Sequence, residues 1–488
     1  MLSETSFEHH CFRRLFSLTL YKNKKIPLGE MSFSKDFVHD THGDLYPVLE
    51  KCGQAEETVA DGLYRLTGAS DASVTRLCGA FFPYATYEIC LLSLEGTAGF
   101  RFIKPDGTVF EVSFGKTKTE SGTFSVNRID SAVSFVPGMR FFVTCRTKHA
   151  DIYYCKPDGA IQFFQTLTAQ NFEDIGHENV FGKTKAALFV SGSVTIKCVS
   201  FYIDCGVSQA DMRPIRYENG DLLIENGRIF LSMSVRMQAE CYQGIFSWVP
   251  GTSDFELCGA LFFDAGDGVP ANDVAVSLLF DRKRQKWLYW VCSFAHGHRL
   301  AHGECAGDVR FGISTVRVDL MPFMPENTPD TAFLAKEGDE DPDFVYDEET
   351  RQWYMTVCRP VTDADGKNRY RYFLFRSDDP FEGYECVSHA LSGEETGGSF
   401  VRDGRSLAFV CGNGFAKRAE YRVYRVPDFR TFSLLKQDYD DGGFRGWGTV
   451  IPFERGSRKR YYHLTFDRHN ASEYNWSYGN LYCFEATE

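Results

Sequence analysis

The sequence predicts an all-β protein in which an N-terminal β-sandwich is followed by a five-bladed β-propeller. Two observations carry this prediction: a high aromatic content, and strand–turn–strand units that recur through the C-terminal half. Aromatic residues make up 15% of the 488 residues, with 44 Phe and 24 Tyr, and such side chains favour pleated, half-buried strands. Helical periodicity is nearly absent, and short apolar or alternating runs are separated by Gly, Asp, Asn and Pro throughout.

The length exceeds what one hydrophobic core supports, so at least two domains are expected. Residues 1–35 read as a loosely ordered extension and residues 36–205 as the sandwich. Two hairpin turns are clear in the sandwich, at Lys104-Pro105-Asp106-Gly107 and Lys156-Pro157-Asp158-Gly159, because Pro presets the first turn position and Asp-Gly tolerates the left-handed conformation. This strand pattern resembles concanavalin-like or laminin-G-like jelly rolls.

Residues 206–488 repeat one layout five times: an apolar strand, a tight polar turn, and a second apolar and aromatic strand. The second strands recur about every 54 to 66 residues, a spacing typical of propeller blades. The alternative is a second β-sandwich with coincidental hairpins. The five units run through 221–231, 276–289, 344–355, 400–409 and 450–463.

Charge and cysteine usage exclude several classes of protein. The net charge is −13, and no basic run with interleaved aromatics offsets it, so we expect no nucleic-acid partner. No run approaches the roughly 18 apolar residues of a membrane span, and the apolar patch near the N-terminus is too short for a secretion signal. The 16 Cys are scattered, without a CxxC pair or a metal-type spacing to His. We therefore expect free thiols and a cytoplasmic location.

Carboxylates precede the first strand of four of the five predicted blades. A propeller places the start of each innermost strand at one mouth of the central channel, so these side chains can converge. The fifth blade instead offers Arg445-Gly446-Trp447-Gly448-Thr449, which holds no acid. The four acids are Asp211, Asp273, Asp341 and Glu395.

This ordered set resembles family-43 glycoside hydrolases and their five-bladed clan. That family carries an Ala-Asp-Pro-like start, then an Asp-Pro before an apolar strand, then a Glu-Gly-Pro-like element. The matching residues here are Ala210-Asp211, Asp341-Pro342, and Glu395 ahead of Gly397-Gly398, separated by about 130 and then about 54 residues. The loop Arg376 to Tyr384 also looks like the loop before the acid in that clan. The resemblance covers roughly residues 206–488.

The resemblance implies a glycosidase that removes a terminal sugar, arabinofuranoside-like or xyloside-like, from an oligosaccharide, with inversion. It implies Asp211 as the base, Glu395 as the acid, and Asp341 as the group that orients the acid and raises its pKa. Such hydrolysis needs one carboxylic acid to protonate the leaving oxygen and one carboxylate to activate water. Asp343 and Glu394 are substitutes for their neighbours.

The predicted sugar contacts are Asp273, His296, Trp447 and Arg445. Trp447 stands where many family members carry a His that helps to hold a metal ion, so no metal and no cofactor are predicted. The alternative functions are a non-catalytic carbohydrate-binding protein and a propeller scaffold for protein partners. Phosphate-binding loops, Ser-His-Asp elbows and zinc motifs are not found in the sequence.

Overall fold

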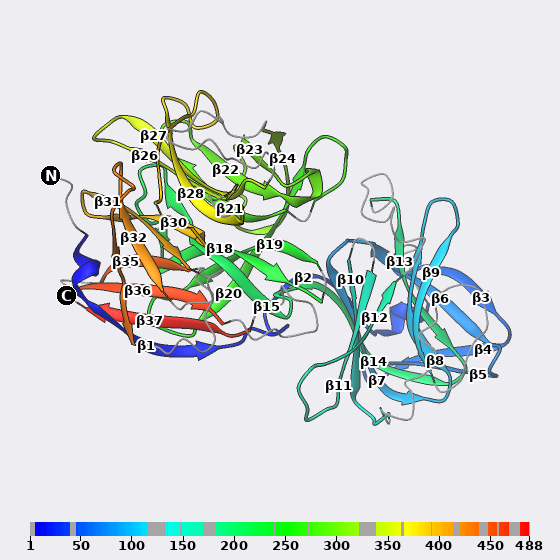
Figure 1. Ribbon diagram of the computed structural model, residues 1–488. Coiled ribbons are helices and arrows are strands. Elements are labelled where there is room, and N and C mark those ends of the chain that lie inside the picture. Colours follow the sequence, from blue (N-terminus) through cyan, green and yellow to red (C-terminus); the bar gives the residue numbers. More distant parts are fainter. Residues whose placement is uncertain are drawn as a thin grey trace. The chain divides into compact units, whose positions relative to one another are not determined.

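The computed structural model divides the chain into two compact units (Figure 1). The propeller unit comprises Met1–Lys24, Cys205–Asp267 and Ala271–Glu488, and the sandwich unit comprises Lys25–Asp204 and Gly268–Pro270. No helix among the described residues is long and apolar enough to cross a membrane. The structure describes residues 5–39, 45–115, 133, 135–146, 149–168, 182–238, 240–271, 273–321, 338–362, 366–391, 393–413, 420–438, 448–455, 458–467 and 479–487.

The described part of the sandwich unit forms two antiparallel sheets around a shared apolar core. Alternation sorts the side chains: in β7, Tyr87 and Ile89 enter the core while Glu88 faces the other way. The larger sheet has the order β12 (Gln162–Thr168), β11 (His149–Cys155), β10 (Met139–Cys145), β7 (Ala85–Leu94), β14 (Val194–Asp204), β5 (Leu63–Gly68) and β4 (Ala55–Ala60), with β2 (Lys25–Met31) on β14. The smaller sheet has the order β3 (Val48–Cys52), β6 (Ser73–Ala80), β13 (Lys185–Ser191), β8 (Thr97–Ile103) and β9 (Val109–Gly115).

Both predicted hairpin turns are confirmed. Strands β8 and β9 pair across the first turn, where the amide of Gly107 donates to the carbonyl oxygen of Lys104 at 3.0 Å. Strands β11 and β12 pair across the second, where Gly159 donates to Lys156 at 3.0 Å. Gly107 has φ of 85°, a conformation that glycine adopts without a steric cost.

The described part of the propeller unit forms five sheets, which confirms the all-β, five-bladed prediction. Their innermost strands, β15, β21, β26, β30 and β35, contact one another in cyclic order. Blade 1 has β15 (Ser208–Pro214), β18 (Arg228–Arg236), β19 (Cys241–Trp248) and β20 (Phe255–Asp264), with β17 (Ile224–Glu225) and β24 (Gly312–Arg317). Blade 2 has β21 (Val274–Asp281), β22 (Lys286–Ser293) and β23 (Arg299–Cys305), with β16 (Arg216–Tyr217) and β25 (Asp319–Leu320). Blade 3 has β26 (Glu340–Asp347), β27 (Gln352–Thr362), β28 (Asn368–Ser377) and β29 (Glu385–His389). Blade 4 has β30 (Thr396–Asp403), β31 (Ser406–Gly412), β32 (Tyr421–Arg425) and β33 (Phe432–Leu434).

The fifth blade corrects the prediction for residues 1–35. Its inner strands are β35 (Thr449–Arg455), β36 (Arg458–Phe466) and β37 (Leu481–Thr487), but its next strand is β1 (Cys11–Leu18), and β34 (Lys436–Asp438) lies outside β1. Residues 25–31 then form β2 of the sandwich unit. The segment is therefore not an extension, because its strand β1 completes blade 5 beside a strand from the other end of the chain (Figure 1). In the sequence, the residues of the sandwich unit stand between β1 and the first strand of blade 1.

Phe12 anchors this closing strand and supplies a test. Its side chain is fully buried with Tyr461 and Phe484 in the core beside blade 5. We expect Phe12→Ala to lower the free energy of unfolding of the propeller by about 3 kcal/mol, because it leaves a cavity in a packed core. All six Trp lie beyond residue 205, so Trp fluorescence during urea unfolding reports on this unit. Leu15→Ala is the matched control, since Leu15 is 41% exposed; equal effects of the two changes would refute the closing role.

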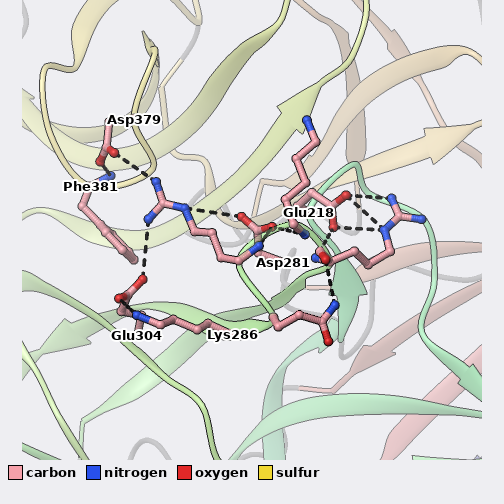
Figure 2. A network of polar contacts seen from close by, with 10 residues as sticks. Glu218, Asp281, Lys286, Glu304, Asp379 and Phe381 are labelled. Carbon is pink, nitrogen blue, oxygen red and sulfur yellow. Dashed lines mark hydrogen bonds and ion pairs between the residues drawn. The ribbon is translucent and has the colours of Figure 1, made fainter.

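Charged side chains connect neighbouring blades at the β21–β22 turn (Figure 2). Arg282 in this turn donates to Glu218 through Nη2 at 2.8 Å, and Arg284 approaches Asp379 of the β28–β29 connection at 3.2 Å. The backbone amide of Lys283 donates to Asp281 at 2.8 Å and shapes the turn. Arg284 and Asp379 are partly exposed, so this pair between blades 2 and 3 contributes little stability alone.

Candidate functional site

Four of the innermost strands share one irregularity, which positions the candidate site. In β15, β21, β26 and β30 the pairing register shifts by one bulge near the start of the strand. Each bulge contains a residue with positive φ: Asp211 (52°), Ala275 (59°), Asp341 (49°) and Gly397 (60°). These four residues therefore occupy equivalent places in blades 1 to 4. Left-handed backbone costs about 1–3 kcal/mol at a non-glycine residue and concentrates at functional sites.

Asp211 is held by an arginine of its own blade. Its Oδ2 atom lies 2.7 Å from Nη2 of Arg236, and 9% of the residue is exposed. A guanidinium at this distance favours the charged carboxylate. Asp211 is therefore a largely buried carboxyl group paired with a cation.

Asp341 has the opposite environment. Burial, together with the charges of Glu340 and Asp211, raises its pKa to about 7, against the opposing effects of Arg213 and the amide of Gly397. The Gly397 amide donates to Oδ2 at 3.0 Å. The residue as a whole is partly exposed, and with a pKa of about 7 its carboxyl group is about half protonated at neutral pH.

Arg213 connects the bulges of three blades. Its Nη1 atom donates to the carbonyl oxygen of Ala275 at 2.7 Å and to that of Pro342 at 2.6 Å. It thus ties blade 1 to the bulges of blades 2 and 3. The structure brings Asp211 and Asp341 together at one end of the ring of inner strands, close enough for the charge of one to act on the other.

Glu395 occupies a different register from these two aspartates. It stands two residues before the bulge of its blade, a place that Gln209, Asp273 and Asp339 hold in the others. Its side chain is fully buried. Its Oε1 atom lies 2.5 Å from Nη1 of Arg422 and accepts a hydrogen bond from the Tyr424 hydroxyl at 2.5 Å.

Asp273 and His296 lie close together in blade 2. Asp273 is 1% exposed, and burial raises its pKa to about 6 against hydrogen bonds from Ser293 and the amide of Ala295. His296, in the short η3 helix (Phe294–His296), contacts Ser293 Oγ through Nδ1 at 2.9 Å and Asp267 through Nε2 at 3.3 Å. His296 is partly exposed, whereas the Asp273 side chain is covered. Trp447 and Arg445 lie outside the described residues.

The two substitute acids also differ. Asp343 is fully buried and bonded to Arg216, Ser277 and the amide of Phe400, so it serves the connection between blades. Glu394 is partly exposed and lies 3.4 Å from Nε of Arg369.

Sequence reasoning missed the basic and aromatic partners of the acids. His298 lies 2.8 Å from Glu340, whose Oε1 atom also accepts the Tyr370 hydroxyl at 2.8 Å. Burial lowers the pKa of His298, but the Glu340 carboxylate outweighs it, and the net shift is upward. Two of these partners could have been noticed in the sequence. Arg213 follows Asp211 by two residues, and His298 follows the predicted sugar contact His296 by two residues.

Two other features bear on the site. Among the described residues, no group of three or more His, Cys, Asp or Glu side chains is arranged to hold a metal ion. A cavity of about 320 Å³ opens at the opposite ends of the inner strands, lined by residues that include Pro214, Arg402 and Lys459. The three cations that line it, Arg216, Arg402 and Lys459, are each paired with a carboxylate: Asp343, Asp347 and Asp403. This cavity contains none of the predicted acids.

Comparison with known proteins gives no close relative. No protein-family model matches the sequence, and no curated protein matches it. Among solved structures, a thermostable family-43 glycoside hydrolase aligns with 12% identity and a TM-score of 0.38, over 58% of this chain and 90% of that chain. An α-L-arabinanase of Penicillium chrysogenum, solved with arabinobiose, aligns with 10% identity and a TM-score of 0.34, over 71% and 89%. A family-43 β-1,3-galactosidase aligns with 8% identity and a TM-score of 0.37, over 56% and 93%. At such values the similarities do not by themselves assign an activity.

Proposed function

We propose that the propeller unit is a glycoside hydrolase that removes a terminal sugar, arabinofuranoside-like or xyloside-like, from an oligosaccharide. One observation carries the proposal: Asp211 and Asp341 lie on equivalent bulges, one paired with Arg236 and the other with its pKa raised to about 7. Two carboxyl groups with opposed environments are the requirement for acid–base cleavage of a glycosidic bond. The ordered motifs that resemble family 43 support the same reaction.

The geometry distributes the roles as follows. Asp211 is the base that activates water, as the family resemblance implies, and its carboxyl group is paired with Arg236. Asp341 is the acid that protonates the leaving oxygen, because it is protonated near neutral pH and partly exposed. Water and the leaving group on opposite faces of the sugar give inversion. The anomer first released, observed by NMR, tests this stereochemistry.

Glu395 is the rival acid. For Glu395 to protonate a sugar, its carboxyl group would have to leave Arg422 and Tyr424 and reach solvent. In the proposed arrangement it instead fixes the start of β30, whose Gly397 amide donates to Asp341. The proposed sugar-binding residues are those predicted from the sequence: Asp273, His296, Trp447 and Arg445.

A panel of p-nitrophenyl glycosides and plant-derived oligosaccharides, scored for released monosaccharide, tests the function. Release of one terminal sugar type is expected. The burial of Glu395 favours a second candidate, a carbohydrate-binding protein without turnover. Calorimetry with the same oligosaccharides separates the two: binding without release would support the second candidate and overturn the first.

The pH dependence of the reaction follows from Asp341. Because Asp341 must be protonated to act as the acid, kcat/KM on an oligosaccharide is expected to fall tenfold per pH unit above about pH 7. An activated aryl glycoside needs little protonation and should lack this alkaline limb. The measurement is kcat/KM from pH 5 to 9 on both substrates; equal alkaline limbs would contradict the role of Asp341.

All sixteen cysteines are free thiols in the structure. This supports our proposal that the protein works in a reducing compartment such as the cytoplasm.

A further inference from the structure

Two cysteines of the sandwich unit stand directly opposite each other on neighbouring strands. Cys90 in β7 and Cys198 in β14 are partners in the antiparallel register. Directly opposed residues point to the same face of a sheet, with Cβ atoms about 4.5–5.5 Å apart. This is the outer face, because the adjacent Ile89 and Val199 enter the core. Cys198 is exposed, and Cys90 is 5% exposed.

Positive charge flanks the pair on both sides. The register shifts between Ile196 and Cys198, so Lys197 is the extra residue of a bulge, and bulges re-aim the side chains around them. On the other side, Arg140 of β10 is in register with Cys90. Cations beside a thiol favour the thiolate, which is the reactive form.

The guanidinium of Arg140 extends the arrangement across the sheet. Its Nη2 atom lies 3.4 Å from the sulfur of Cys155, and its Nη1 atom donates to Glu88 at 3.1 Å. One row of side chains therefore crosses the four adjacent strands β11, β10, β7 and β14: Cys155, Arg140, Cys90 and Cys198. Arg140 is held in place by its own partners, so its charge beside Cys90 is fixed.

We propose that Cys90 and Cys198 form a reactive dithiol that a low-molecular-weight disulfide converts into a cross-strand disulfide. The Cys90 thiolate attacks one sulfur of the small disulfide and releases one small thiolate, which takes up a proton. The Cys198 thiol, on losing its proton, attacks the Cys90 sulfur of the mixed disulfide and releases the second small thiol. Two protein thiols are oxidised to one disulfide, and one small disulfide is reduced to two thiols.

The acidity of the pair agrees with this chemistry. A hydrogen bond from Cys198, together with the charges of Lys197 and Arg140, lowers the pKa of Cys90 to about 7, against the effects of burial and of Glu88. The pKa of Cys198 is raised in turn, so the two sulfurs share one proton near neutral pH. By contrast, burial raises the pKa of several core thiols: Cys145, Cys292, Cys358, Cys411 and Cys483.

The expected disulfide is readily reversible. Cβ atoms of opposed strand residues are farther apart than the roughly 3.5–4.5 Å of a relaxed disulfide. The bond therefore forms with strain in the sheet, and strained, exposed disulfides are the easily reduced ones.

The test treats the full chain at pH 7.5 with oxidised glutathione, blocks the remaining thiols with N-ethylmaleimide, and maps peptides by non-reducing mass spectrometry. We expect a linked peptide joining Cys90 to Cys198 that dithiothreitol removes. Cys198→Ser should instead accumulate one glutathione on Cys90, because the second attack is lost. Arg140→Gln should slow formation of the linked peptide about threefold, since a rise of about one unit from a pKa of about 7 lowers the thiolate fraction at pH 7.5 from about three quarters to about one quarter.

Cys52→Ser is the matched control, because Cys52 is an exposed thiol that lies outside the Cys155–Arg140–Cys90–Cys198 row, and it should leave the linked peptide unchanged. The proposal is overturned if the wild-type chain gives no linked peptide. It is also overturned if Cys90 reacts no faster than Cys52 with iodoacetamide in the unmodified protein. The iodoacetamide rate needs no variant, so a folding defect in Cys198→Ser would not obscure the result.

Discussion

Asp341→Asn is expected to lower kcat/KM on an oligosaccharide by about 10²- to 10⁴-fold, the contribution typical of a positioned general acid. Turnover of an activated aryl glycoside should change little, because its leaving group departs without protonation. The amide keeps the size of the side chain but cannot supply the proton. The measurement is kcat/KM for both substrate types.

Two further variants make this result decisive. Asp211→Asn should slow both substrates equally, because activation of water is needed for either leaving group. Glu395→Gln should also affect both substrates alike, since its carboxylate acts on the structure through Arg422 and Tyr424. If Glu395→Gln alone spares the aryl glycoside and Asp341→Asn does not, the acid is Glu395 and our assignment is wrong.

Folding of Asp341→Asn can be checked by its pH dependence. An aspartate with a raised pKa is protonated in the folded state at a pH where it is ionised in the unfolded chain, so it reduces stability as pH rises from about 4 to about 7. Asparagine has no such cost. The variant should therefore be at least as stable as the wild type at pH 8, and its lost activity would not reflect unfolding.

The sequence predicted the fold class well because its signals are local. Apolar and aromatic strands joined by Pro-Asp-Gly turns identify hairpins wherever they occur, and five recurring units identify blades. The closing strand Cys11–Leu18 was missed because only Phe12 is fully buried along it. Its partner Leu481–Thr487 lies at the far end of the chain, and a local sequence pattern does not predict a pairing between strands so far apart in the sequence.

The candidate site was predicted in part, for the same reason. Ala-Asp and Asp-Pro marked the two bulges, and the structure brings Asp211 and Asp341 together. The sequence did not show that Glu395 stands two residues before the bulge of its blade, whereas Asp211 and Asp341 lie on theirs. A bulge shifts the strand register by one residue, and no sequence motif marks its place here. Nor could the sequence show that Arg422, on a strand two places from the channel, would hold Glu395.

Asp343→Leu is expected to have the largest effect on stability, about 5 kcal/mol lost from the unfolding free energy of the propeller. Asp343 is fully buried, and its Oδ1 atom lies 2.6 Å from Nη2 of Arg216, which is 2% exposed. The hydroxyl of Ser277 also donates to Oδ1, and the amide of Phe400 donates to Oδ2 at 2.6 Å. One carboxylate thus satisfies donors from blades 2 and 4 and from the segment leading out of blade 1.

Removing it leaves a buried guanidinium without its counter-ion, which costs about 3–5 kcal/mol, and leaves a buried amide without an acceptor, which costs about 1–3 kcal/mol. Lys286→Met is the control, since the Lys286–Glu304 pair in Figure 2 has side chains 41% and 32% exposed and should contribute less than about 1 kcal/mol. Urea unfolding followed by Trp fluorescence measures both variants. The double variant Asp343→Leu with Arg216→Met should recover part of the loss, because the uncompensated charge is gone. If Asp343→Leu unfolds at the same urea concentration as Lys286→Met, the three blades are not held by this carboxylate, and Asp343 returns as a candidate for the chemistry assigned to Asp341.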